Sequence, residues 1–168
     1  MGSKKIPTCP QTSSDIYFLS MRKLLIFDWG RTLYDPETKN VFPGAQTILR
    51  ELRSRYELAI VSLATDGDTE RRFNAIRGAG IENFFSRILV AKEGKGELYE
   101  QALRELKYSP EHAIIIDDRT VRGIRWGNLN GATTIWVKRG KFSEEIPTED
   151  TGQPDYTVLE IGEILAIL

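Results

Sequence analysis

Three aspartates follow two separate apolar runs of this 168-residue chain. Asp28 ends the run LLIF, and Asp117 with Asp118 ends the run AIII. Carboxylates that converge from parallel strands repel one another, so they need a cation or a raised pKa on one of them. Such oxygen ligands favour Mg²⁺, which binds through one or two carboxylates together with waters and substrate phosphate. The aspartates therefore predict a magnesium site that handles a phosphorylated ligand.

Two further residues near strand ends have side chains that suit a phosphate group. Ser62 follows the run LAIV and can donate a hydrogen bond to a phosphate oxygen. Lys95 follows the run RILVA and can offset charge on both a nucleophile and a phosphoryl group. Lys92 is the alternative to Lys95 for this role.

Short apolar runs alternate with segments of helical spacing from residue 21 onward. We expect strands at 23–29, 57–64, 85–92, 111–118, 132–138 and 154–158, and helices at 43–56, 69–80, 95–108, 119–131 and 159–168. This alternation predicts an α/β fold, a Rossmann-like three-layer α/β/α sandwich with a mostly parallel sheet of five or six strands. Ligands of such sheets bind at the carboxyl ends of the strands, where the polar residues named above lie.

The composition narrows the classes of function. The net charge of -1 gives no electrostatic reason to expect nucleic acid or an anionic membrane as the main partner. The sequence has no run of 18 apolar residues, so it predicts no membrane-spanning helix. The single cysteine, Cys9, cannot form an internal disulfide, and the single histidine, His112, excludes a multi-histidine zinc site. We expect a cytoplasmic protein with His112 on its surface.

Residues 1–20 lack the periodicity of the remaining chain and predict a leader or flexible tail, which leaves 21–168 as a single domain. We expect Trp136 in the sheet core and Trp29 beneath the site or at its edge. The arginines of the first two predicted helices are expected on solvated faces: Arg50, Arg53, Arg55, Arg71 and Arg72.

Four motifs together resemble the haloacid dehalogenase-like (HAD) hydrolase superfamily from residue 21 to the end. They are the run ending in Asp28 with Thr32 and Leu33 after it, LAIVS, KGELYEQAL and AIIIDD. Each motif alone is weak, but all four occur in the family's order and with similar spacing.

The resemblance implies a role for each matching position. Asp28 corresponds to the nucleophile that forms an aspartyl-phosphate. Mg²⁺ would bind the Asp28 carboxylate, the main-chain oxygen of Gly30 and Asp118, with Asp117 as a further candidate. The phosphoryl group would be held by Thr32, Ser62 and Lys95, and Arg31 could add a cation beside it.

Two glycines depart from the family pattern. Gly30 stands where the family has the aspartate that acts as general acid and base, a role typically worth about 100- to 10,000-fold in rate. Gly123 stands where many members have another metal-site aspartate, for which Asp117 could partly substitute. Glycine at residue 30 keeps the main-chain metal ligand and removes the proton donor.

Two functions remain open at this point. About thirty residues separate Asp28 from Ser62, and about as many separate Ser62 from Lys95, which leaves no room for the inserted cap domain of dehalogenases. The first function is a capless, magnesium-dependent phosphatase for a phosphorylated small molecule or macromolecule. Capless members of the family tend to close their sites by oligomerising, so the resemblance also suggests a homo-oligomer. The second is a weakened HAD domain that only binds a phosphorylated ligand or protein partner.

Overall fold

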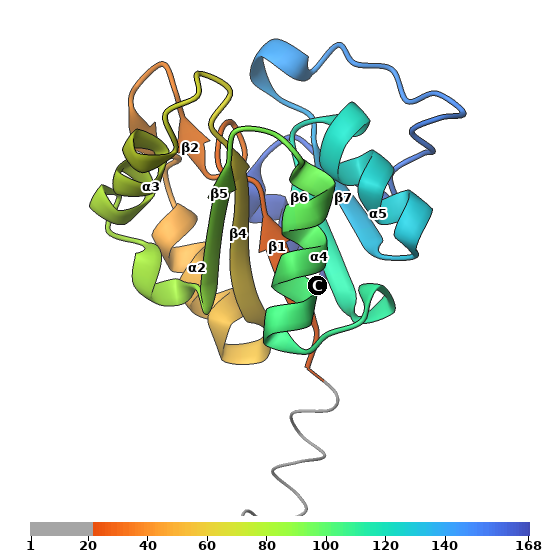
Figure 1. Ribbon diagram of the computed structural model, residues 1–168, viewed down its shortest axis with the longest axis horizontal. Coiled ribbons are helices and arrows are strands. Elements are labelled where there is room, and N and C mark those ends of the chain that lie inside the picture. The colour runs from red at the N-terminus through yellow and green to blue at the C-terminus, as the bar shows by residue number, and fades with distance from the viewer. Residues whose placement is uncertain (1–21) are drawn as a thin grey trace, which may run out of the picture.

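A parallel six-stranded sheet forms the centre of the computed structural model, which describes residues 22–168 (Figure 1). The predicted leader or tail at 1–20 lies outside these residues. The strand order is β5-β4-β1-β6-β7-β8. The strands are β1 (Leu24–Phe27), β4 (Glu57–Leu63), β5 (Arg87–Ala91), β6 (Ala113–Asp117), β7 (Thr133–Val137) and β8 (Tyr156–Val158). All five strand pairs are parallel, which confirms the predicted sheet.

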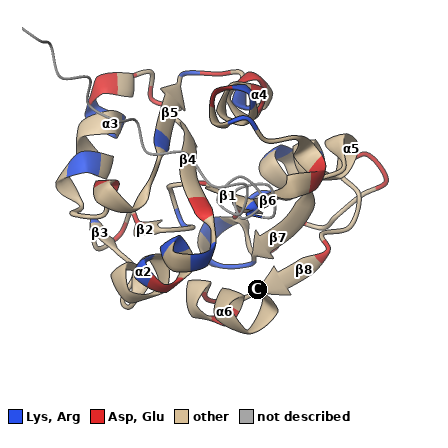
Figure 2. Cartoon of the chain, turned by 90° about the horizontal axis from the view of Figure 1, so that it is seen from below, with Lys and Arg blue, Asp and Glu red and all other residues tan. Residues whose placement is uncertain are grey.

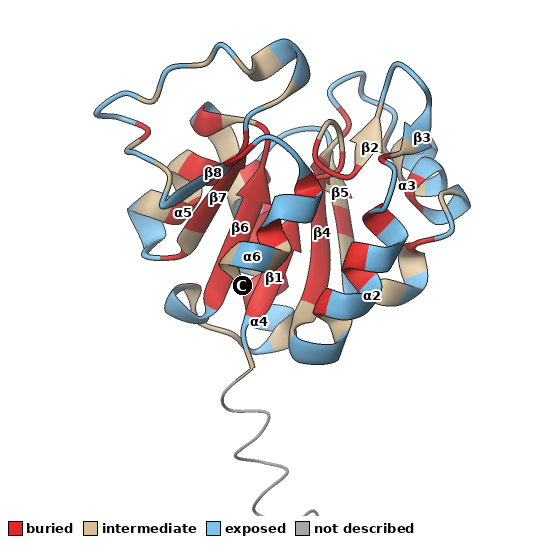
Figure 3. Cartoon of the chain, turned by 180° about the vertical axis from the view of Figure 1, so that it is seen from behind, coloured by how far each residue is buried: buried red, intermediate tan, exposed pale blue. Residues whose placement is uncertain are grey.

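Helices cover both faces of the sheet and complete the three layers (Figures 1 and 3). The helices are α2 (Ala45–Arg55), α3 (Thr69–Gly78), α4 (Lys95–Leu106), α5 (Arg125–Asn130) and α6 (Ile164–Ile167). One core cluster joins the sheet to α2, α3 and α6, and a second joins its other face to α4 and to Trp126 of α5. Apolar side chains on both faces explain why the central strands are continuous hydrophobic runs.

Three local elements differ from the predicted boundaries. A small hairpin, β2 (Tyr34–Asp35) with β3 (Asn40–Val41), follows the turn after β1. The predicted helix at 119–131 begins as a π-helical turn, Thr120–Ile124, whose first amide, that of Thr120, donates to the Glu145 carboxylate. The last predicted helix shortens to a 3₁₀ turn, Ile161–Glu163, and α6.

The connections at the carboxyl edge of the sheet are short. Between β1 and β4 the chain forms only the β2–β3 hairpin and α2, and between β4 and β5 it forms α3 and a 3₁₀ turn, Glu82–Phe84. The described residues therefore hold no inserted cap domain, as predicted. None of their helices is long and apolar enough to cross a membrane.

Candidate active site

Three buried carboxylates meet at the carboxyl edge of the sheet. Asp28 follows β1 directly, Asp117 is the last residue of β6 and Asp118 follows it. Because β1 and β6 are parallel neighbours with Phe27 opposite Ile116, their ends lie side by side. One oxygen of each carboxylate lies within 4.8 Å of the others. The predicted convergence of the aspartates is thus present in the structure.

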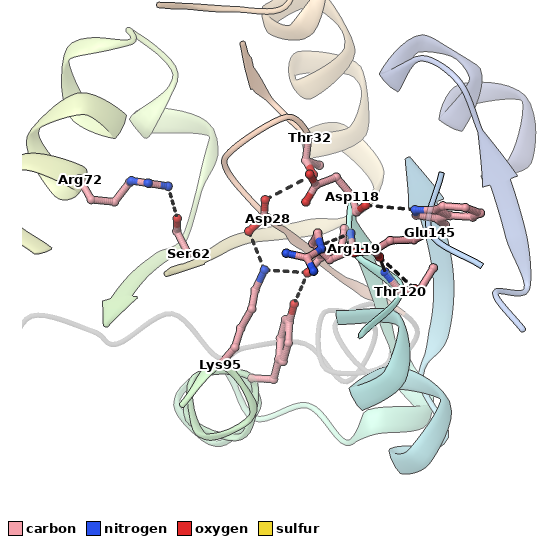
Figure 4. A network of polar contacts seen from close by, with 12 residues as sticks. Asp28, Thr32, Ser62, Arg72, Lys95, Asp118, Arg119, Thr120 and Glu145 are labelled. Atoms are coloured by element: carbon pink, nitrogen blue, oxygen red, sulfur yellow. Dashed lines mark hydrogen bonds and ion pairs between the residues drawn. The ribbon is translucent and has the colours of Figure 1, made fainter. Parts of the chain in front are cut away.

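Lys95, the first residue of α4, lies between two of these carboxylates (Figure 4). Its Nζ is 2.6 Å from Oδ1 of Asp28 and 2.6 Å from Oδ2 of Asp117. The Lys95 side chain is buried, whereas Lys92 is exposed. Of the two candidate lysines, Lys95 is therefore the one that contacts the Asp28 carboxylate.

The Asp117 carboxylate accepts hydrogen bonds from three donors. Its Oδ2 accepts from Lys95 Nζ and, at 3.0 Å, from the Tyr99 hydroxyl, while its Oδ1 accepts from the Arg119 amide at 2.9 Å. Asp117 therefore positions Lys95 against Asp28. Sequence reasoning missed Tyr99, although Lys95 and Tyr99 are four residues apart and hence share one helix face.

The electrostatics of the cluster favour a bound cation. Burial, followed by repulsion from Asp28 and Asp117, raises the pKa of Asp118 to about 9. Burial also raises the pKa of Asp28, although the ammonium of Lys95 opposes the shift. Burial by itself disfavours the charged form of Lys95, but Asp117 and Asp28 outweigh it and raise its pKa, so this side chain stays cationic.

Mg²⁺ fits the residues present at this site. Oδ2 of Asp118 is buried and has no hydrogen-bond partner among residues 22–168, which is costly for a carboxylate oxygen unless a cation binds it. The surrounding donors are hard oxygen ligands, and Lys95 supplies only one positive charge for three carboxylates. Asp28 and Asp118, with the main chain of Gly30, could hold the ion.

The residues predicted to bind the phosphoryl group lie at different places around the carboxylate cluster. Thr32 is buried, and its hydroxyl lies 3.5 Å from Oδ2 of Asp28, at the limit of a hydrogen bond. Ser62 is also buried, at the end of β4, where its hydroxyl accepts a hydrogen bond from Arg72. The guanidinium of Arg31 lies 5.0 Å from the ring centre of Phe142, on the cleft wall.

A cleft of about 580 Å³ opens above the carboxylates. Asp28, Gly30 and Asp118 lie in its wall. It is also lined by six cationic side chains: Arg31, Lys39, Arg71, Arg72, Arg119 and Arg122. Although the whole chain has a net charge of -1, this cleft carries an excess of positive charge that suits an anionic ligand.

Arg72 corrects the prediction that both arginines at the start of α3 are solvated. Arginine positions are spread along α2 and α3 (Figure 2), and Arg71 is exposed and paired with Asp66. Arg72 instead turns toward the site, where its Nη1 donates to Ser62 Oγ at 3.1 Å (Figure 4). The signal for this was Ile76, a buried residue one helical turn later on the same face.

The remaining residues singled out from the sequence lie as expected. Trp136 is buried in the sheet, and its indole N–H donates to the Asp118 main-chain oxygen at 3.1 Å. Trp29 is buried and stacks on Tyr34 with ring centres 4.8 Å apart at the cleft. His112 is exposed at the opposite end of β6, with Nδ1 3.0 Å from the Ser109 hydroxyl.

Comparison with known proteins agrees with this geometry. The profile of the haloacid dehalogenase-like hydrolases matches residues 8–137. The chain belongs to this family. It is 28% identical to glyceraldehyde 3-phosphate phosphatase from Pyrococcus furiosus over 131 residues, 75% of this chain and 53% of that one. It is 30% identical to phosphoserine phosphatase from Thermus thermophilus over 129 residues, 74% of this chain and 49% of that one.

The HAD fold is also found by comparison with solved structures. A haloacid dehalogenase-like hydrolase from Streptococcus pneumoniae superimposes with a TM-score of 0.72 at 18% identity, covering 88% of this chain and 99% of that one. The chain spans about half the length of the two phosphatases to which it is similar. Residues 8–137, which match the family profile, contain the whole carboxylate cluster.

Three carboxylates near residue 30 in the described part of the chain, Asp35, Asp66 and Asp68, are each engaged as hydrogen-bond acceptors. Asp66, at the cleft rim, accepts from the Asp68 amide and pairs with Arg71, and these contacts lower its pKa. Asp68 accepts from the Arg71 amide as the cap of α3. Hydrogen bonds from Glu37 and Thr38 lower the pKa of Asp35.

Proposed function

We propose that this protein is a magnesium-dependent phosphatase that hydrolyses a phosphate monoester through nucleophilic attack by Asp28. The observation that carries the proposal is the contact between Lys95 Nζ and Asp28 Oδ1, 2.6 Å apart and buried beside two further carboxylates. The similarity to two phosphatases supports it.

In this proposal each side chain has a defined task. Lys95 favours the ionised form of Asp28, which is the form that can attack phosphorus, and it then faces the phosphoryl oxygens. Asp117 and Tyr99 keep Lys95 in position. Thr32 and Ser62 supply hydroxyl groups around the phosphoryl group. Mg²⁺, when bound, would offset the negative charge of the carboxylates and the phosphoryl group.

A panel of phosphate esters, assayed with Mg²⁺, tests the proposal. We expect turnover in the wild type and its loss in Asp28→Asn, which keeps the size of the side chain and removes its charge. Asp150→Asn is the matched control, because Asp150 is an exposed residue that pairs with Arg125 at the surface. Turnover that persists in Asp28→Asn would contradict the proposal.

Gly30 supports the second candidate, a HAD domain that binds a phosphorylated ligand without turnover. This reading predicts no hydrolysis by the wild type together with measurable binding of inorganic phosphate in the presence of Mg²⁺. Strong hydrolysis by Gly30→Asp with none by the wild type would favour it over the enzyme, because only the acid/base group would then be missing.

A further inference from the structure

The guanidinium of Arg72 lies beside Gly30. A Cβ atom built on Gly30 meets one atom within 4 Å, the Nη1 of Arg72 at 3.8 Å. The backbone of Gly30 is not in the left-handed region, so its conformation does not require glycine. A cation from α3 therefore lies in van der Waals range of any Cβ atom at residue 30.

Arg72 is also placed to act on a bound phosphoryl group. Its Nη1 donates to the Ser62 hydroxyl, so the hydroxyl proton of Ser62 is free to point toward another acceptor. Arg72 has no carboxylate within 4.0 Å among residues 22–168, and its side chain lines the same cleft as Asp28 and Asp118. Unpaired guanidinium N–H groups in a partly closed cleft bind phosphate oxygens strongly.

The groups that α3 and its preceding loop bring to the cleft can stabilise charge but are poorly suited to transfer a proton, and Asp118, which also lines the cleft, is the proposed ligand of Mg²⁺. A guanidinium remains protonated at all ordinary pH values, so it cannot serve as a general acid. Asp66, which lines the cleft, and Asp68, the cap of α3, both accept hydrogen bonds, and the contacts of Asp66 lower its pKa. A departing group must therefore leave without receiving a proton from a side chain beside residue 30.

We propose that Arg72 is a catalytic cation of this site and that the substrate is a phosphate compound whose leaving oxygen is a weak base. This class comprises acyl phosphates, phosphoanhydrides and aryl phosphates. The inference rests on the proposed function and adds the substrate class to it. Alkyl phosphates such as sugar or glycerol phosphates are poor substrates in this scheme, because an alkoxide leaves only when it is protonated.

The reaction balances without an enzyme acid. An Asp28 oxygen forms a bond to phosphorus, and the bond from phosphorus to the leaving oxygen breaks, so the leaving group departs with the electron pair as a carboxylate, phosphate or phenolate anion. Water then attacks the aspartyl-phosphate, the bond from phosphorus to Asp28 breaks, and both water hydrogens end on inorganic phosphate as H₂PO₄⁻. Arg72 offsets the charge that develops on the phosphoryl and leaving oxygens.

The first test compares four substrates in order of rising leaving-group basicity: acetyl phosphate, 4-nitrophenyl phosphate, phenyl phosphate and glycerol phosphate. The enzymes are the wild type, Gly30→Asp and the double variant Gly30→Asp with Arg72→Gln. We expect kcat/KM of the wild type to fall steeply along the series. The kcat/KM of the double variant should depend least on leaving-group basicity. Its ratio of kcat/KM for glycerol phosphate to kcat/KM for acetyl phosphate should exceed that of the wild type by about 100-fold or more.

Gly30→Asp alone should gain less than the double variant, because Arg72 would pair with the introduced carboxylate and keep it ionised. This coupling is specific to a guanidinium that occupies the residue-30 space. Equal slopes for the wild type and the double variant, or wild-type turnover of glycerol phosphate as fast as that of 4-nitrophenyl phosphate, would overturn the substrate class.

The second test measures binding of inorganic phosphate by calorimetry in the presence of Mg²⁺. Arg72→Gln should weaken binding about 10- to 100-fold, which is the usual effect of losing a charge-assisted hydrogen bond, and Arg72→Lys should recover part of it. Arg77→Gln is the matched control on the same helix, since Arg77 is exposed and contacts Phe73. Equal affinities for Arg72→Gln and Arg77→Gln would overturn the assigned contact.

The two tests separate failure of this inference from failure of the proposed function. If the wild type hydrolyses none of the four substrates, both the phosphatase and the substrate class are wrong. If the wild type hydrolyses the four substrates without dependence on leaving-group basicity, and Arg72→Gln binds phosphate as well as Arg77→Gln does, the phosphatase stands and this inference falls. Thermal melting of every variant identifies any loss that comes from unfolding.

Discussion

Gly123 lies so close to Asp117 that no side chain fits at residue 123. A Cβ atom on Gly123 would be 2.3 Å from Oδ2 of Asp117 and 2.6 Å from the Tyr99 hydroxyl. Both groups are buried and hold Lys95 in place, so neither can move without loss of a hydrogen bond. The aspartate that many HAD proteins have at this position is thus incompatible with the Asp117–Lys95 pair of this chain.

Gly123→Ala is therefore expected to lower the free energy of unfolding by about 1–3 kcal/mol, as overpacking of a buried site usually does. It should also reduce any phosphatase activity, because it displaces Asp117 from Lys95. Urea unfolding measures the first effect. Gly78→Ala is the control: its Cβ meets nothing within 4 Å on α3, so it should be neutral or stabilising by up to about 1 kcal/mol. Equal stabilities of the two variants would contradict the steric account.

Magnesium is expected to stabilise the protein through Asp118. After treatment with EDTA, addition of MgCl₂ should raise the melting temperature. The free energy of unfolding should increase by about 2.7 kcal/mol when the Mg²⁺ concentration is 100 times the dissociation constant. Asp118→Asn should abolish this response and itself raise the melting temperature of the metal-free protein, because it removes one of three converging carboxylates. Asp150→Asn, the surface control, should keep the rise in melting temperature with Mg²⁺. An equal rise in Asp118→Asn and in Asp150→Asn would exclude the assigned site.

The stability of the metal-free protein should fall as the pH rises. The pKa of Asp118 is about 9 in the folded state against 3.8 as its ordinary value, so between these pH values the folded state binds the extra proton. Stability from this group is fully present below about pH 4 and is lost progressively up to about pH 9. Urea unfolding in EDTA across this range should show the decline in the wild type and a flatter profile in Asp118→Asn. Identical profiles would mean that Asp118 ionises normally.

Glu145 is expected to hold the segment 140–145, whose Phe142 lines the cleft. Its carboxylate pairs with Arg119 and accepts from both the amide and the hydroxyl of Thr120. Glu145→Ala should speed hydrogen exchange of the Thr120 amide about 10- to 100-fold, because a partly buried charged acceptor is lost. Glu144→Ala is the matched control, since the exposed Glu144 contacts only the Ser143 hydroxyl, at 3.4 Å, among its hydrogen bonds. Equal exchange in both variants would contradict this role.

Much of the carboxylate cluster could be predicted from sequence pattern. Apolar runs that are buried on both faces must be central strands, and parallel strands end at one edge, so Asp28, Asp117 and Asp118 had to lie near one another. The pattern of apolar runs could not decide which lysine contacts Asp28. Lys92 and Lys95 both follow β5, and only the start of α4 at Lys95 directs one of them to Asp28.

The amino-acid sequence by itself determined the layered α/β fold, the edge of the sheet that carries the site and the loss of a carboxylate at residue 30. The fold and the edge follow from hydrophobic periodicity, which is a local property of the chain, and the loss at residue 30 follows from the resemblance of this stretch to the HAD motif. Only the tertiary structure decided that Arg72 rather than Arg71 enters the cleft, that Asp117 holds Lys95 and that Gly123 has no room for a side chain. The physical reason is that the rotation of a helix and the contacts of a buried polar group depend on packing between segments far apart in the chain.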